Sequence, residues 1–170
     1  QTSPHTTSVN ARFFAAAQRD FAARLKWSVT PAYEGANHEP VVRIDGPLAL
    51  SAGAGQTIRL RGTATDPDRD AVTVQWWHYE DASTYPGAVV IANATSLDTS
   101  LRIPSDAQAG QTIHVILEAT DNGTPSLSVT NSFTLTVNEV NLSPVLTVPA
   151  SQSISELFAF SANATATDAD

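Results

Sequence analysis

Two short stretches of the sequence place aspartates at every second position directly after a strand-like run. The first is TDPDRD, with Asp66, Asp68 and Asp70, and the second is ATDAD, with Asp168 and Asp170. Calcium is a hard cation that takes six to eight oxygen ligands, several of them carboxylates, at one spot. Asp-Pro-Asp is also a good turn former without any metal. The spacing therefore leaves two interpretations, a calcium site and a plain turn.

Two further polar segments can reach the same end of a β-sandwich as the first aspartate loop. The segment ATDNGTP contains Asp121 and Asn122, and the segment GANHEP contains Asn37 and Glu39. Loops that follow different strands can meet at one pole of a sandwich, where their carboxylates and amides would converge. We therefore count Asn37 and Asp121 among the candidate calcium ligands of the first loop.

The elements that must position these loops are short strands. From Val41 onward the apolar residues recur at every second position, which is the period of a half-buried strand, and turn-forming segments separate the runs. This pattern predicts an antiparallel β-sandwich. The side chains expected to point inward are Ile58, Leu60, Ala64, Val72, Val74, Trp76, Ile113, Val115, Leu117, Ala119, Val129, Phe133, Leu135 and Val137.

The sequence contains an internal repeat. The phrase HEPVV returns as LSPVL, with Pro40 and Pro144 separated by 104 residues (144 − 40), and the two Asp-x-Asp pairs are separated by 102 residues (168 − 66). A period of about 100 residues is the size of one immunoglobulin-like domain. We expect one complete module over residues 37–139 and the opening third of a second over residues 140–170.

The phrases ATDPD, ATDNGTPSLS and VNEVNLSPVL resemble cadherin-type repeats of bacterial surface proteins. In that family an Asp-x-Asp loop, an Ala-x-Asp-x-Gly loop and a linker before a proline share calcium between successive domains. This chain departs from the pattern at Ala54, where the second copy has an acid, and at Leu142 and Ser143, where the linker prefers acids or amides. The ligands that the resemblance implies are Asp66, Asp68 and Asp121 in the first module and Glu139, Asn141, Glu156, Asp168 and Asp170 at the second junction.

Residues 9–27 are predicted to form a single amphipathic helix. Phe13, Ala17, Phe21 and Leu25 recur every four residues, and Phe14 widens this apolar stripe. A face so rich in phenylalanine needs a partner. We expect Phe13, Phe14 and Phe21 to dock on an upstream domain of the same protein.

The stretch VQWWHYEDASTYPG concentrates aromatic residues. If Trp76 points into the core, Trp77 and Tyr79 lie on the opposite face of the strand with Gln75. Exposed aromatic rings beside polar groups suit sugars, whose CH faces stack on the π system. The candidate carbohydrate contacts are Gln75, Trp77, Tyr79 and Tyr85. The alternative is that Trp77 is buried against the helix or another domain.

A longer resemblance covers residues 20 to about 137. The phrase RDFAARLKWSV, then Y-x-x-A-N-H-x-P, W-W-x-Y-x-x-A-x-T-Y-x-G and HVILEATDNGTP, is similar to the C-terminal part of cellulose-binding proteins with a nucleoside-hydrolase-like N-terminal domain. The resemblance implies that residues 1–36 are the last helix and linker of that hydrolase-like domain. Because a further cadherin-like repeat starts after residue 139, we also expect a longer, modular protein that is secreted or attached to the cell surface.

Composition excludes several classes of function. The chain has 9 Lys and Arg against 17 Asp and Glu, which argues against a nucleic-acid partner. It has no cysteine and no apolar run of about 18 residues, so we expect neither disulfides nor a membrane span.

None of the common hydrolase, zinc or nucleotide motifs occurs, and the four histidines lack metal-ligand spacing. We expect this stretch of chain not to be an enzyme.

These observations predict a mainly β, immunoglobulin- or cadherin-like antiparallel sandwich preceded by one amphipathic helix. The favoured function is a non-catalytic accessory module that binds a cellulose-like glycan through Trp77 and Tyr79. The competing hypothesis is a calcium-stiffened spacer or adhesion module without a sugar ligand. Exposure of Trp77 separates the two, because a tryptophan buried under the helix cannot stack on a sugar.

Overall fold

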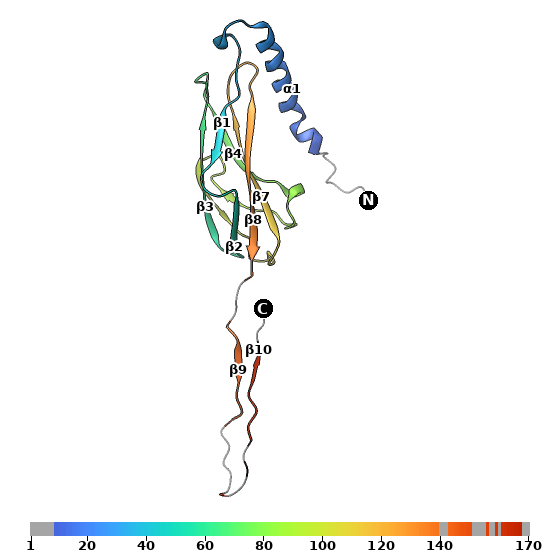
Figure 1. Ribbon diagram of the computed structural model, residues 1–170, viewed down its shortest axis with the longest axis vertical. Coiled ribbons are helices and arrows are strands. Elements are labelled where there is room, and N and C mark those ends of the chain that lie inside the picture. Colours follow the sequence, from blue (N-terminus) through green and yellow to red (C-terminus); the bar gives the residue numbers. More distant parts are fainter. Residues whose placement is uncertain (1–8, 140–142, 151–155, 157–158, 160, 168–170) are drawn as a thin grey trace. The chain divides into compact units, whose positions relative to one another are not determined.

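The structure is a computed structural model that describes residues 9–139, 143–150, 156, 159 and 161–167. The chain divides into two compact units, residues 1–138 and residues 139–170 (Figure 1). Each unit is described by itself.

The first unit contains two four-stranded sheets that pack face to face. One sheet has the strand order β1-β3-β6-β5 and the other has the order β2-β8-β7-β4. Two short 3₁₀ turns, η1 (Tyr33–Gly35) and η2 (Glu80–Ala82), lie outside the sheets. The strands are β1 (Val41–Ile44), β2 (Ala49–Gly53), β3 (Thr57–Thr65), β4 (Thr73–His78), β5 (Ile91–Ala92), β6 (Asp98–Arg102), β7 (Thr112–Thr120) and β8 (Ser128–Asn138).

The predicted fold class is confirmed, with one refinement in the strand pairing. Five of the strand pairs in the sandwich are antiparallel, but β2 runs parallel to β8, with Leu50 opposite Leu135. The long antiparallel pair of β7 and β8 anchors this sheet, and β4 extends it with Trp76 opposite Leu117. Strand β4 therefore forms one edge of the sheet and carries the aromatic stretch to that edge.

Alternating side chains fill the space between the sheets, as the period of two predicts. Every inward position of β7 is buried, and Phe133, Leu135 and Val137 of β8 are buried with them. The indole of Trp76 is fully buried, and its Nε1 donates to the carbonyl of Ser96 at 2.9 Å. Leu101 and Ile103 complete the core, although the sequence pattern did not single them out.

Helix α1 (Val9–Val29) is where predicted, but it packs through a different face. The less exposed positions are Phe13, Ala16, Asp20, Ala23 and Trp27, which alternate by three and four residues. The reason is geometric: four residues turn an α-helix by about 400°, so a strict i, i+4 stripe drifts away from one face by about 40° at each step. Among the described residues, no helix is long and apolar enough to span a bilayer.

The predicted stripe is consequently split between two faces of α1. Phe13 contacts the sandwich, whereas Phe14 is 62% exposed, Phe21 61% and Leu25 54%. Phe13, which was expected to dock on an upstream domain with Phe14 and Phe21, instead packs against Trp77 and Tyr79.

The second unit contains one described strand pair, β9 (Val145–Thr147) with β10 (Thr165–Thr167). Its register pairs Val145 with Thr167, and in the first unit β1 and β3 pair Val41 with Thr65. These partners are separated by the same 104 (145 − 41) and 102 (167 − 65) residues as the sequence repeat. The second unit thus reproduces the pairing of the first and third strands of the sandwich.

Candidate functional site

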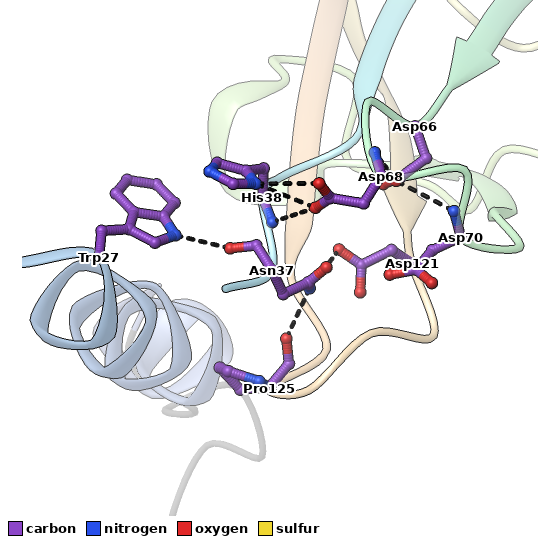
Figure 2. A network of polar contacts seen from close by, with 8 residues as sticks. All are labelled: Trp27, Asn37, His38, Asp66, Asp68, Asp70, Asp121 and Pro125. Atoms are coloured by element: carbon purple, nitrogen blue, oxygen red, sulfur yellow. Dashed lines mark hydrogen bonds and ion pairs between the residues drawn. The ribbon is translucent and has the colours of Figure 1, made fainter. Parts of the chain in front are cut away.

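Three carboxylates gather in the loop that follows β3. Asp66, Asp68 and Asp70 are each half-buried, and each has one ligand atom within 4.8 Å of the others (Figure 2). The loop folds around Asp66, whose Oδ1 accepts the backbone N–H of Asp68 at 2.8 Å and that of Asp70 at 3.1 Å. Its other oxygen, Oδ2, is buried and accepts no hydrogen bond from the part of the chain that the structure describes. Three carboxylates so close together are suited to a hard divalent cation.

The cluster affects the acidity of its last member. Desolvation raises the pKa of Asp70, and the neighbouring charges of Asp66, Asp121 and Asp68 raise it further. A raised pKa means that the ionised form of Asp70 is disfavoured in the folded protein. A bound cation would remove this repulsion.

Asn37 and Asp121 bond to each other instead of joining the cluster. The Asn37 Nδ2 donates to Asp121 Oδ2 at 3.0 Å and to the carbonyl of Pro125 at 2.8 Å. Asp121 is only 4% exposed, and its Oδ1 accepts the N–H groups of Gly123 and Leu127. A Cβ at Gly123 would clash with the Asn37 amide, so glycine is required there. These hydrogen bonds hold the loop after β7 in its conformation without a metal.

The four residues predicted as ligands of the first module fall into two groups in the structure. The structure brings Asp66 and Asp68 together, as expected, but the third carboxylate within 4.8 Å is Asp70, not Asp121. Asp70 belongs to the alternating aspartates of the first loop, which the sequence analysis offered as a calcium site or a plain turn. At the second junction, Glu139 and Glu156 are exposed, whereas Asn141, Asp168 and Asp170 lie outside the described residues.

His38 connects the aspartate loop to the helix. Its backbone N–H donates to Asp68 Oδ2 at 2.6 Å, and its Nδ1 lies 3.1 Å from both carboxylate oxygens of Asp68. The imidazole stacks against Tyr33 at 3.6 Å between ring centroids and against Trp27 at 5.2 Å. The Trp27 Nε1 in turn donates to the carbonyl of Asn37 at 2.7 Å (Figure 2). The sequence assigned no role to His38, because one histidine and one aspartate 30 residues apart make no local motif.

The aromatic face of β4 is partly covered by the helix. The ring of Trp77 lies 6.2 Å from that of Phe13 and 5.6 Å from that of Tyr79, and Phe13 also contacts Tyr79 edge-on. Trp77 and Tyr79 are half-buried, and Gln75 is exposed. Trp76 and Trp77 do point to opposite sides of the strand, as the phase predicts.

Tyr85 does not belong to this face. It is 7% exposed and is part of the hydrophobic core, and its hydroxyl donates to Asp106 Oδ1 at 2.9 Å. The prediction that Tyr85 contacts a sugar is therefore wrong, because a buried ring presents no face to a ligand.

A cavity of about 410 Å³ opens beside β4 at the edge of the sheet. Trp77, His78 and Glu80 contribute to one wall, and Val89 and Val90 contribute to another. Burial lowers the pKa of His78, so this imidazole is neutral near pH 7, with its Nε2 2.8 Å from Ser83 Oγ. Trp77 therefore lines a cavity to which one carboxylate residue, Glu80, and one neutral imidazole residue, His78, also contribute.

The two packed sheets and their order define an immunoglobulin-like β-sandwich domain. Residues 57–137 match the family model described as the C-terminal domain of the cellulose-binding protein Sde0182. The resemblance to the C-terminal part of cellulose-binding proteins is thereby confirmed over these residues of the sandwich.

A solved structure with 35% sequence identity supports the same assignment. It is a nucleoside hydrolase-related hypothetical protein from Saccharophagus degradans that is associated with carbohydrate metabolism, and it superposes with a TM-score of 0.71. The match covers 75% of this chain and 32% of that protein, so the chain spans about a third of its length. A second solved structure, cadherin domains 3–6 of protocadherin gamma B2, matches with 21% identity and a TM-score of 0.35 over 76% of this chain and 32% of that one. No match was found among curated proteins.

Proposed function

We propose that this chain is a non-catalytic module that holds a cellulose-like polysaccharide for a larger secreted or surface-attached protein. The observation that carries the proposal is the position of Trp77 on the edge strand β4, where it is half-buried and is one of the residues that line a cavity together with Glu80. The match of residues 57–137 to a domain of a cellulose-binding protein supports a polysaccharide as the ligand. A sugar ring would stack on the indole while its hydroxyl groups reach Glu80 and Gln75.

The partial cover over Trp77 is compatible with this role. Phe13 lies tilted by 37° against the indole and fixes its orientation, and a fixed ring loses less entropy on binding than a mobile one. The contact leaves a smaller platform than the sequence predicted, formed by Trp77 and the edge of Tyr79.

Affinity electrophoresis tests this function. The complete 170-residue chain should migrate more slowly in a native gel that contains hydroxyethylcellulose, and Trp77→Ala should restore its normal mobility. Leu48→Ala is the matched control, because Leu48 is 53% exposed and lies outside the cavity. Equal mobility of all three proteins with and without the polymer would contradict the proposal.

We propose a second ligand, a divalent cation such as Ca²⁺, at Asp66, Asp68 and Asp70. The observation that favours it is the buried Oδ2 of Asp66, which lies within a group of three carboxylates. A cation there would hold the loop after β3 and stiffen this end of the sandwich.

We also propose that the exposed face of α1 packs on another domain of the same protein. Phe14, Phe21 and Leu25 are spaced to share one face of the helix. The relative from Saccharophagus degradans is about three times as long as the part that this chain matches, which leaves ample chain to cover this face.

A further inference from the structure

A second cavity lies at the pole of the sandwich, and Trp77 is not among its lining residues. It has a volume of about 750 Å³ and is bounded by the end of α1, the turn η1, the aspartate loop and the loop after β7. Cavities of this size are typical of small-molecule sites. The residues that matter for its chemistry are Lys26, Tyr33, Glu34, Arg69, Asp70 and Asn122.

Tyr33 gives this cavity a fixed aromatic wall. Its ring is stacked on His38 with an interplanar angle of 4°, and His38 is itself held by Asp68. The Tyr33 side chain nevertheless remains 58% exposed, because only one face of the ring is covered. An aromatic ring with one face held and the other open is suited to stacking on the CH face of a sugar.

Polar groups of both signs surround the ring. The cavity is lined by two basic side chains, Lys26 and Arg69, and by three acidic ones, Glu34, Asp68 and Asp70. Such a lining offers hydrogen-bond donors and acceptors on several sides, which suits the hydroxyl groups of a neutral sugar. It carries no net positive charge, so it disfavours an anionic ligand such as phosphate or a uronic acid. Partial desolvation and the charges of Asp68 and Asp66 raise the pKa of Tyr33, so its phenol remains a hydrogen-bond donor at neutral pH.

We infer that the cavity at the pole is a second carbohydrate site, in which Tyr33 stacks on a neutral β-1,4-glucan oligosaccharide while Glu34 and Lys26 bind its hydroxyl groups. The inference rests on the proposed glycan-binding function for the class of sugar, but it uses none of the residues of the β4 cavity. The site binds sugar through direct contacts and needs no cation.

Titration of the chain with cellotetraose in the presence of EDTA tests the inference, with Trp77→Ala as the background that removes the β4 platform. The Trp77→Ala chain should still bind cellotetraose. Adding Tyr33→Ala should weaken that binding at least about ten-fold, the equivalent of about 1.4 kcal/mol, whereas Tyr33→Phe keeps the ring and should retain it. Glu34→Gln, at an exposed position, should also weaken binding without changing the thermal midpoint.

The outcomes separate this inference from the proposed function. If the wild-type chain binds cellotetraose and Trp77→Ala abolishes all binding, the proposed function stands and the second site does not exist. If neither binds, the proposed function fails and the inference fails with it. Weaker binding of cellotetraose in EDTA than without it would also overturn the inference, because a cation would then bridge the sugar and the protein. Tighter binding of tetragalacturonate than of cellotetraose would overturn it as well, because the site would then prefer an anionic sugar.

Discussion

The ring of Phe13 lies 6.2 Å from the ring of Trp77, and the same phenylalanine meets Tyr79 edge-on at 6.2 Å. Helix α1 and strand β4 are therefore joined by a three-ring cluster, although Phe13 and Trp77 are 64 residues apart (77 − 13). This contact decides how much of the predicted sugar platform is available. It covers part of the indole, and Trp77 remains half-buried among the residues that line the β4 cavity.

Removing the cover should expose the platform. In Phe13→Ala we expect the Trp77 indole to gain exposure, so that tryptophan emission shifts to longer wavelength while retention on cellulose is kept or increased. Aromatic pairs contribute about 0.5–1.5 kcal/mol beyond their buried area, so the free energy of unfolding should fall by about 1 kcal/mol. Phe21→Ala is the matched control, because Phe21 lies on the exposed face of the same helix. Loss of retention in Phe13→Ala alone would mean that the helix contact, and not the indole face, is needed for binding.

Asn37→Ala should destabilise the first unit more than an ordinary polar truncation does. It removes the donor to Asp121 Oδ2 and to the carbonyl of Pro125, and so leaves a buried carboxylate with one partner fewer. Hydrogen bonds to charged groups contribute about 1.5–3 kcal/mol, so urea unfolding should show a loss of about 2–3 kcal/mol. Asn138→Ala, at an exposed position at the end of β8, should stay within about 0.5 kcal/mol of wild type. Equal effects of the two variants would show that the Asn37–Asp121 bond does not hold this pole.

Calcium should stabilise the first unit through the aspartate cluster. A ligand that binds only the folded state raises the free energy of unfolding according to its concentration relative to its dissociation constant. At about 1 mM Ca²⁺, within the affinity range of extracellular calcium modules, we expect a higher thermal midpoint than in EDTA. Asp66→Asn should abolish this increase, and Asp81→Asn, an exposed acid in η2, should not. An unchanged midpoint in wild type, or an increase that survives in Asp66→Asn, would contradict a cation at this cluster.

The raised pKa of Asp70 should make the stability of the first unit depend on pH. Because the pKa of Asp70 is raised in the folded state, the native protein binds this proton more tightly than the unfolded chain, and stability falls as pH rises through that pKa. In EDTA at pH 7, Asp70→Asn should therefore have a higher thermal midpoint than wild type. The difference should shrink as pH falls below the ordinary range of aspartate, about 3.9, because Asp70 is then protonated in both states. A difference that does not change with pH would show that charge is not the cause.

The strands and most of the core could be predicted from the sequence, because the period of two in β7 and β8 directly reflects which side chains meet the other sheet. The register of β9 with β10 likewise follows the repeat of Pro40 and Pro144. Leu101 and Ile103 were missed, because β6 is short and its alternation carries little signal.

The faces and partners of the site were harder to predict. The apolar residues of α1 are distributed around most of its circumference, so the choice of Phe13 over Phe21 as the packing residue depends on tertiary contacts. Asp121 looked like a metal ligand because a carboxylate after a strand suits both a metal and a turn, and only the position of Asn37, 84 residues away, decides between them. The stack of Tyr33 on His38 could not be predicted either, because the irregular backbone between α1 and β1 has no period that places side chains on a common face.

A binding isotherm on microcrystalline cellulose tests the central claim most directly. Wild type, Trp77→Ala and Leu48→Ala would be equilibrated as complete chains with increasing amounts of the solid, and the protein left in solution would be measured. We predict saturable retention of wild type and Leu48→Ala, and at least about a ten-fold loss of affinity in Trp77→Ala, the equivalent of about 1.4 kcal/mol. Retention of Trp77→Ala equal to that of wild type, or no retention of wild type, would contradict glycan binding through the β4 cavity.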